Sequence, residues 1–237
     1  MPMMYSYFDP TYLMVIIGAV ICLAASARVK TTFNKYASVP SRSGMSGAMA
    51  AQRILNAAGI YDVVITRVSG SLTDHYNPKD KTLHLSDSVY GSSSVAAVGV
   101  AAHECGHAIQ HARGYAPLSI RSALVPIANI GSTLAWPLII IGLLFSRNST
   151  SSLVTAGIIC FSMAVLFQLV TLPVEFDASR RALRMLGDTG ILGGDEVQET
   201  RKVLSAAALT YVASAAAAIL QLLRLIILFG GRGRRDD

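Results

Sequence analysis

The sequence predicts a mainly α-helical membrane protein in which three or four transmembrane helices carry a small α+β domain with a β-hairpin. Of the 237 residues, 52% are hydrophobic and only 14% are charged, whereas a soluble globular protein carries about 25% charged residues. Three long stretches contain almost no charge, and one polar stretch holds short runs of β-branched residues. The composition indicates a membrane protein, and the two patterns locate its spans and its polar domain.

The first expected membrane segment is an N-terminal anchor formed by residues 1–28. Tyr12–Ala27 is apolar and uncharged, and Arg28 and Lys30 follow it directly. Aromatic and basic residues flanking an apolar stretch are typical of a transmembrane helix. A cleaved signal peptide would carry its positive charge before the apolar stretch, so we expect an anchoring helix with its N-terminus outside.

Residues 29–121 form the polar domain, in which a helix and two strands precede a second helix. Gly44–Ala58 has apolar residues at helical spacing, Val63–Val68 is β-branched, and Thr82–Leu85 alternates between polar and apolar side chains. The intervening residues Ser69–Asp80 are rich in turn formers. We therefore expect the two strands to form a small hairpin ahead of the second helix.

Two further apolar stretches follow the polar domain. Residues 122–174 contain a single charged residue and predict a transmembrane hairpin that turns near Arg147–Ser152. Residues 175–202 are polar and return to the side of the polar domain. Residues 203–237 form an apolar helix and a basic tail. This helix either crosses the membrane as a fourth span, or packs its alanine-rich first half against the polar domain and lays its second half on the membrane surface.

The basic residues predict that the polar domain lies in the cytoplasm. The net charge is +6, and cations cluster next to the expected spans on the side of the polar domain, as the positive-inside rule requires. They are Arg28, Lys30, Arg113, Arg121, Arg180, Arg181 and Arg184. No nucleic-acid-binding motif accompanies them, so the lipid bilayer rather than nucleic acid is the expected partner. The three cysteines show no disulfide framework, which suits a reducing compartment.

The second helix of the polar domain contains the pattern His-Glu-x-x-His at residues 103–107. Residues four apart on an α-helix lie about 40° apart around its axis, so His103 and His107 project from one face. Two imidazoles at this spacing can hold one zinc ion. Glu104 lies beside them and can reach a water activated by the metal. The pattern therefore predicts a catalytic zinc site with Glu104 as the base.

The alternative interpretation of the motif is a solvated helix face that matches by chance. Small residues favour the zinc site, because they let a second helix and a metal ion come close to the motif. They are Ala101, Ala102, Gly106 and Ala108. Cys105 occupies a variable position of the pattern, and we expect it to pack against neighbouring helices rather than bind the metal.

A catalytic zinc site usually has three protein ligands and one open position. Glu175 and Asp177 are the candidates for the third ligand, because both lie where the third expected span leaves the membrane. An acidic residue there can also simply complement a helix dipole. We favour Glu175 as the ligand and the dipole interpretation for Asp177. His111 lies one turn beyond His107 without metzincin spacing, and is expected to be an interface residue or a neighbour of the site.

Five stretches resemble the YugP-like neutral zinc metallopeptidases of bacterial membranes. They are Gly70–Tyr76, Leu85–Ser86, Ala101–His111, Thr171–Ser179 and Ala206–Val212. More distantly, the chain is similar to the HtpX-type membrane gluzincins, whose third zinc ligand is the glutamate of Glu-x-x-Ala-Asp. Residues 175–178 match Glu-x-x-Ala, so the resemblance implies a zincin-type domain with Glu175 as third ligand. Ser179 stands in place of the aspartate, and Asp177 is a candidate to replace its contact with a ligand histidine.

The expected function is zinc-dependent hydrolysis of peptide bonds in membrane or membrane-adjacent proteins, with one zinc ion. Glu104 would take a proton from metal-activated water and pass it to the leaving amine. The strand Thr82–Leu85 could pair with an extended substrate. Further residues expected around the site, as oxyanion donors or as partners of the ligands, are Asp177, His111, Arg180, Arg181 and Tyr211.

Two other functions compete with this one. An intramembrane metalloprotease would carry the motif on a full span, but the apolar stretch Val95–Ala102 ahead of His103 is much shorter than the roughly 20 residues that a span needs. A membrane scaffold or partner-binding protein could keep a structural zinc ion without turnover. Such a closed structural site has no need for Glu104, which favours the peptidase.

Overall fold

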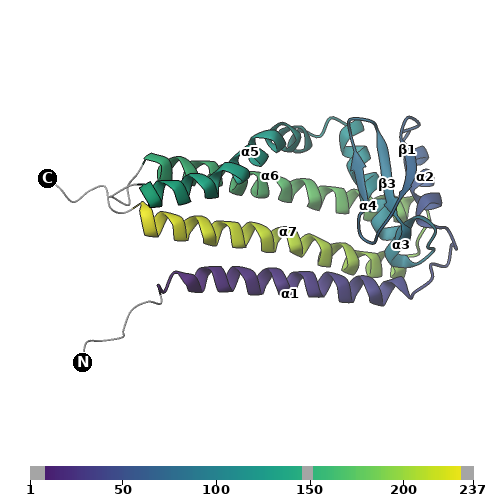
Figure 1. The fold of residues 1–237 in the computed structure, drawn as a ribbon. Coiled ribbons are helices and arrows are strands. Elements are labelled where there is room, and N and C mark those ends of the chain that lie inside the picture. Colours follow the sequence, from purple (N-terminus) through teal and green to yellow (C-terminus); the bar gives the residue numbers. More distant parts are fainter. Residues whose placement is uncertain (1–8, 146–151, 231–237) are drawn as a thin grey trace, which may run out of the picture. The chain divides into compact units, whose positions relative to one another are not determined.

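The computed structural model describes residues 9–145 and 152–230 and is mainly α-helical with one small sheet, as predicted (Figure 1). In chain order the elements are α1 (Tyr12–Ala37), α2 (Gly47–Ala57), β1 (Val64–Val68), β2 (His75–Asn77), β3 (Thr82–Ser86), α3 (Asp87–Tyr90), α4 (Val95–Ala112), α5 (Ala116–Phe145), α6 (Ser152–Asp188) and α7 (Gly194–Phe229). Among the described helices, α1, α5, α6 and α7 are long and apolar enough to cross a membrane. The expected turn near Arg147–Ser152 falls almost entirely outside the described residues.

The chain divides into two compact units, which we describe separately. The apolar unit comprises the described parts of residues 1–24, 121–170 and 211–237, and the site unit comprises residues 25–120 and 171–210. The four long helices each contribute residues to both units. For residues 203–229, the structure shows one continuous helix whose first part, up to Thr210, belongs to the site unit.

Helices of the apolar unit approach one another closely at small residues. A Cβ atom on Gly131 of α5 would lie 2.7 Å from the Cys160 carbonyl oxygen of α6, and one on Gly157 would lie 2.8 Å from the Ala135 oxygen. These distances allow only glycine without a shift of the backbone. Small residues at helix contacts are the usual packing device inside membranes, where lipid is as apolar as the side chains.

Arg224 interrupts the apolar sequence of α7, and the structure supplies it with partners at the start of α1. Its Nε donates to Thr11 Oγ1 at 3.2 Å, and its guanidinium lies 4.3 Å from the centre of the Tyr12 ring. The Asp9 carboxylate lies 3.9 Å away. A charged side chain in an apolar helix is costly unless it is paired, so these contacts explain how α7 tolerates this arginine.

The sheet of the site unit has the strand order β1-β3-β2, with β3 in the centre. β1 pairs with β3 in parallel, and β2 pairs with β3 antiparallel. A hairpin is therefore present, but β2 and β3 form it, and β2 lies within the stretch Ser69–Asp80 that was expected to be turn alone. The predicted pairing of Val63–Val68 with Thr82–Leu85 as a hairpin is wrong. The connection between them holds a strand of its own, which lets β1 reach the other edge of β3 in parallel.

The core of the site unit forms around α4. Small and branched side chains of α4 pack against Ile54 and Leu55 of α2 and against Leu83 and Leu85 of β3, all fully buried. Fourteen of the 18 residues of α4 are buried, a pattern typical of a helix enclosed on all sides. This packing on all sides fixes the position of α4, the helix that carries the His-Glu-x-x-His pattern.

Candidate metal centre

The motif helix α4 begins where the sequence supplies a cap. Ser94 has an extended backbone, and its side-chain oxygen accepts a hydrogen bond from the Ala97 amide at 3.2 Å. The following residues contain no proline, so the helix runs unbroken to Ala112. His103 and His107 therefore lie one turn apart on the same face, as their spacing predicts.

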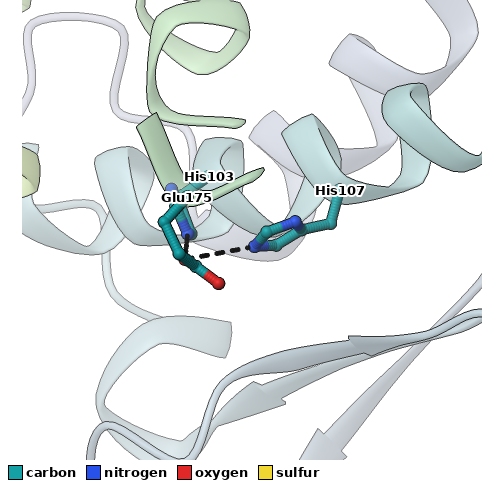
Figure 2. A group of neighbouring side chains, drawn as sticks. All are labelled: His103, His107 and Glu175. Atoms are coloured by element: carbon teal, nitrogen blue, oxygen red, sulfur yellow. Dashed lines mark hydrogen bonds and ion pairs between the residues drawn. The ribbon is translucent and has the colours of Figure 1, made fainter. Parts of the chain in front are cut away.

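Three side chains from two helices converge at this face (Figure 2). Glu175 Oε2 of α6 lies 3.2 Å from His103 Nε2 and 3.5 Å from His107 Nε2. One ligand atom from each residue lies within 4.8 Å of the others, and Glu175 is 3% exposed. The structure thus places Glu175 with the two histidines and leaves Asp177 outside the group, as favoured from the sequence.

The outer nitrogen of each imidazole has its own partner. His103 Nδ1 lies 3.1 Å from Ser179 Oγ, and His107 Nδ1 lies 3.1 Å from Gln110 Oε1. The Gln110 amide nitrogen donates to the Val174 carbonyl and to Asp177, so its oxygen is the atom that faces His107. That oxygen can only accept, which makes Nδ1 of His107 the protonated nitrogen and leaves Nε2 with a lone pair toward Glu175.

This donor set fits a zinc ion. Two imidazole lone pairs and a buried carboxylate oxygen form three ligands of the types that catalytic zinc sites use. The hydrogen bonds at the outer nitrogens orient the rings, as partners of zinc-binding histidines commonly do. The lone pairs of the two histidines and the carboxylate of Glu175 repel one another. Without a metal ion, only a proton bound between them can relieve this repulsion. Burial alone would lower the pKa of His107, but hydrogen bonding to Glu175 and the charges of Glu104 and Glu175 outweigh it, and the pKa is raised.

The resemblance gives one aspartate the contact with a ligand histidine. In this structure, Ser179 and Asp177 share that role. Ser179 itself contacts His103. Asp177 contacts the other histidine only through Gln110, and it also binds Arg181 Nε at 2.5 Å. Asp177 was the expected replacement, whereas Gln110 and Ser179 were not anticipated as partners. The position of Gln110, three residues after His107 on a helix, was the signal that could have identified it.

Glu104 is almost fully buried, at 8% exposed, and is not one of the three converging ligands. Among the described residues it has no hydrogen-bond partner that would hold it away from the site. Its neighbour Cys105 is fully buried in the core and donates to the Ala51 carbonyl at 3.6 Å. Burial raises the pKa of the Cys105 thiol, so this cysteine packs the helix, as predicted.

The remaining histidines of the site unit lie outside the ligand group. His111 Nδ1 lies 2.9 Å from the Tyr76 hydroxyl, which ties β2 to the end of α4. Burial raises the pKa of Tyr76 to about 12, so its hydroxyl stays protonated. His75 stacks on His84 across the β2–β3 pair, with ring centres 4.5 Å apart. His111 therefore contacts β2 and lies outside the ligand group.

The candidate oxyanion donors have different surroundings. Arg181 is engaged by Asp177, and its guanidinium lies 5.4 Å from the centre of the Tyr115 ring. Arg180 lines a groove of about 460 Å³ together with Ser179 and Arg184. Tyr211 belongs to the apolar unit. The role of each in stabilising an oxyanion stays a prediction.

Gly106 permits the close approach of the two helices that supply the ligands. A Cβ atom at this position would lie 2.4 Å from the Ala178 carbonyl oxygen of α6 and 2.9 Å from its carbonyl carbon. Backbone atoms cannot rotate away as a side chain can. Ala178 lies between Glu175 and Ser179 in the sequence, so any displacement there is passed to both residues that contact His103.

We expect Gly106→Ala to destabilise the folded protein by about 1–3 kcal/mol, because overpacking forces α4 and α6 apart, and to weaken zinc binding. Thermal unfolding in detergent and a zinc titration measure the two effects. The control is Gly187→Ala, which lies in α6 with open space around its Cβ and should be neutral or stabilising by up to about 1 kcal/mol. Equal behaviour of the two variants would contradict close packing at Gly106.

Comparison with known proteins identifies the family of the chain. Residues 11–230 match the family described as "Putative neutral zinc metallopeptidase". The chain is 46% identical over 207 residues to the protein named "Putative membrane protease YugP" from Bacillus subtilis (strain 168), covering 86% of this chain and 90% of that protein. No solved structure matches the chain. The converging histidines and glutamate are therefore found in a chain that belongs to the family of neutral zinc metallopeptidases.

Proposed function

We propose that this protein is a membrane-anchored zinc endopeptidase that cleaves membrane or membrane-adjacent polypeptides, with its site unit in the cytoplasm. The observation that carries the proposal is the convergence of His103 Nε2, His107 Nε2 and Glu175 Oε2, with the outer histidine nitrogens bound elsewhere. A bound zinc ion supplies Lewis acidity, which activates water and polarises a substrate carbonyl.

Glu104 is the proton carrier in this proposal. It adjoins the ligand His103 in the helix and is buried, so its carboxylate acts in a medium where charge interactions are strong. It takes a proton from the attacking water and delivers it to the leaving amine. Within the site unit, Arg180 is the remaining candidate for stabilising the oxyanion, because Asp177 already engages Arg181.

A strand needs a free edge to pair with an extended substrate. The expectation that Thr82–Leu85 provides this edge was wrong. β3 is the central strand, and β1 and β2 occupy its two edges. The outer edge of β2 is the better candidate, because the Tyr76 hydroxyl holds β2 to His111 at the end of α4. Pairing through the main chain would tolerate many substrate sequences.

Membrane-adjacent substrates are favoured by where the third ligand lies. Glu175 and the apolar residues before it belong to one continuous helix, α6, that is apolar enough to cross a membrane. An intramembrane protease is disfavoured, because α4 is not among the described helices long and apolar enough to span and is enclosed in the core of the site unit. The cytoplasmic orientation rests on the distribution of basic residues.

The experiment that tests this function measures zinc content and proteolysis on the same detergent-purified sample. We expect one zinc ion per chain and cleavage of an unfolded membrane polypeptide. Chelation should abolish cleavage, and stoichiometric zinc should restore it. One tightly held zinc ion without turnover on any unfolded polypeptide would instead identify a scaffold, the alternative that the sequence left open.

A further inference from the structure

A groove separate from the metal centre lies in the site unit between the last turns of α1 and the first turns of α7. Its volume is about 480 Å³. Four cations line it: Arg28 and Lys35 from α1, and Arg201 and Lys202 from α7. None of the zinc-site residues contributes to it, so it needs a role of its own.

The groove is built from two matched polar faces. On α1 the lining residues are Arg28, Thr31, Thr32 and Lys35, and on α7 they are Gln198, Arg201, Lys202 and Ser205, with Tyr36 in addition. Both sets follow the spacing i, i+3, i+4, i+7, which places each set on a single helix face. Neighbouring helices usually turn apolar faces to each other. Here they present cations, hydroxyls and an amide instead.

The positive charge of the groove is not balanced by the protein. No carboxylate lines it, and in the described part of the chain none of the four cations has a carboxylate within ion-pair distance. Lys35 lies 5.5 Å from the centre of the Tyr36 ring, a contact that leaves its charge in place. Four like charges around one groove repel one another, so an anion that neutralises them is stabilised there.

The position of the groove along its helices points to the surface of a membrane. The apolar stretch of α1 ends at Ala27, one residue before Arg28, and the uncharged stretch of α7 begins at Val203, one residue after Lys202. Both helices are long and apolar enough to span. Cations that directly flank an apolar span lie at the depth of the lipid headgroups.

We infer that this groove binds the phosphate headgroup of an anionic phospholipid. Arginine and lysine donate charge-assisted hydrogen bonds to phosphate oxygens, and the hydroxyls of Thr31, Thr32 and Ser205 supply further donors. Basic pockets between transmembrane helices on the cytoplasmic side are a recognised mode of lipid binding. A headgroup bound there would link α1 to α7 independently of the zinc site.

The test uses the full-length protein and native mass spectrometry, which counts bound lipids. The protein in neutral detergent is titrated with phosphatidylglycerol, with phosphatidylcholine as the zwitterionic probe and with inorganic phosphate as a competitor. We expect one phosphatidylglycerol to be retained at least about tenfold more tightly than phosphatidylcholine, and to resist millimolar phosphate.

The variant Arg28→Gln/Lys202→Gln should lose this preference by about tenfold. Both side chains are exposed and have no hydrogen bond among the described residues, so folding should be preserved. The matched control is Lys30→Gln/Arg113→Gln, which removes the same charge from exposed residues outside the groove and should bind the lipid as the unmodified protein does.

Where both double variants lose binding equally, the attraction is general surface charge and the site is disproved. Displacement by inorganic phosphate identifies a free-phosphate site, and equal binding of the two lipids excludes headgroup recognition; either result overturns the proposal.

Discussion

Glu175→Gln is expected to abolish tight zinc binding and with it peptide cleavage. The substitution keeps the size of the side chain but removes the charge that lies 3.2 Å and 3.5 Å from the two histidine nitrogens. Changing a residue that merely orients a zinc ligand costs about 10–100-fold in metal affinity, so losing a ligand should weaken zinc binding by more than about 100-fold. A competition titration against a chromophoric chelator measures this change.

The matched control for Glu175 is Asp177→Asn, the same removal of charge two residues along the same helix. Asp177 binds Gln110 and Arg181 and is not in the ligand group. We expect this variant to keep one zinc ion per chain, with affinity reduced by at most about 100-fold. If Asp177→Asn lost the metal and Glu175→Gln retained it, the third ligand would have to be reassigned to Asp177.

The sequence could predict the centre of the site because the geometry there is local. The spacing of His103 and His107 fixes their common face once α4 is a helix, and the capping residue and the absence of proline predict that helix. Glu175 is distant in the sequence, and it could be proposed because the expected transmembrane hairpin returns it to the same side. Its preference over Asp177 came from the resemblance and from its position.

The partners of the ligands depend on packing that periodicity does not encode. The sequence predicts the transmembrane hairpin only as far as residue 174, but α6 continues through Pro173 to Asp188. Proline removes one backbone hydrogen bond, at a cost of about 3 kcal/mol in an isolated helix, which tertiary packing here overrides. Because the helix continues, Ser179 lies one turn after Glu175, and a single helix contacts both nitrogens of His103.

The strand pairing was mispredicted for a related reason. Two strands that follow each other with a turn-rich connection usually form a hairpin. The three residues of β2 are too short to give a clear alternating pattern. Asp74 accepts hydrogen bonds from the Ser86 amide and hydroxyl at 2.7 Å and 2.9 Å, which fixes this strand beside β3. Such a side-chain contact is a property of the folded domain, and the sequence pattern alone could not reveal it.

Glu104→Gln is expected to leave zinc bound while lowering kcat by about 10²–10⁴-fold, the usual contribution of a general base. Glutamine has nearly the same shape but cannot accept a proton from water at neutral pH. Because Glu104 is not among the three ligands, the zinc content should remain one ion per chain. The measurement combines kcat at saturating substrate with metal analysis of the same preparation, so that a loss of zinc is not mistaken for the loss of the general base.

The control for Glu104 is Glu199→Gln, a half-buried residue of α7 in the same unit that has no hydrogen bond among the described residues. It should retain both zinc and activity. The pair of results separates the two functions that the site could serve. A scaffold with a structural zinc ion would show no turnover with or without either substitution, whereas a peptidase must distinguish them. Full activity in Glu104→Gln with zinc bound would remove Glu104 from the reaction and would require another residue near His103 and His107 to move the proton.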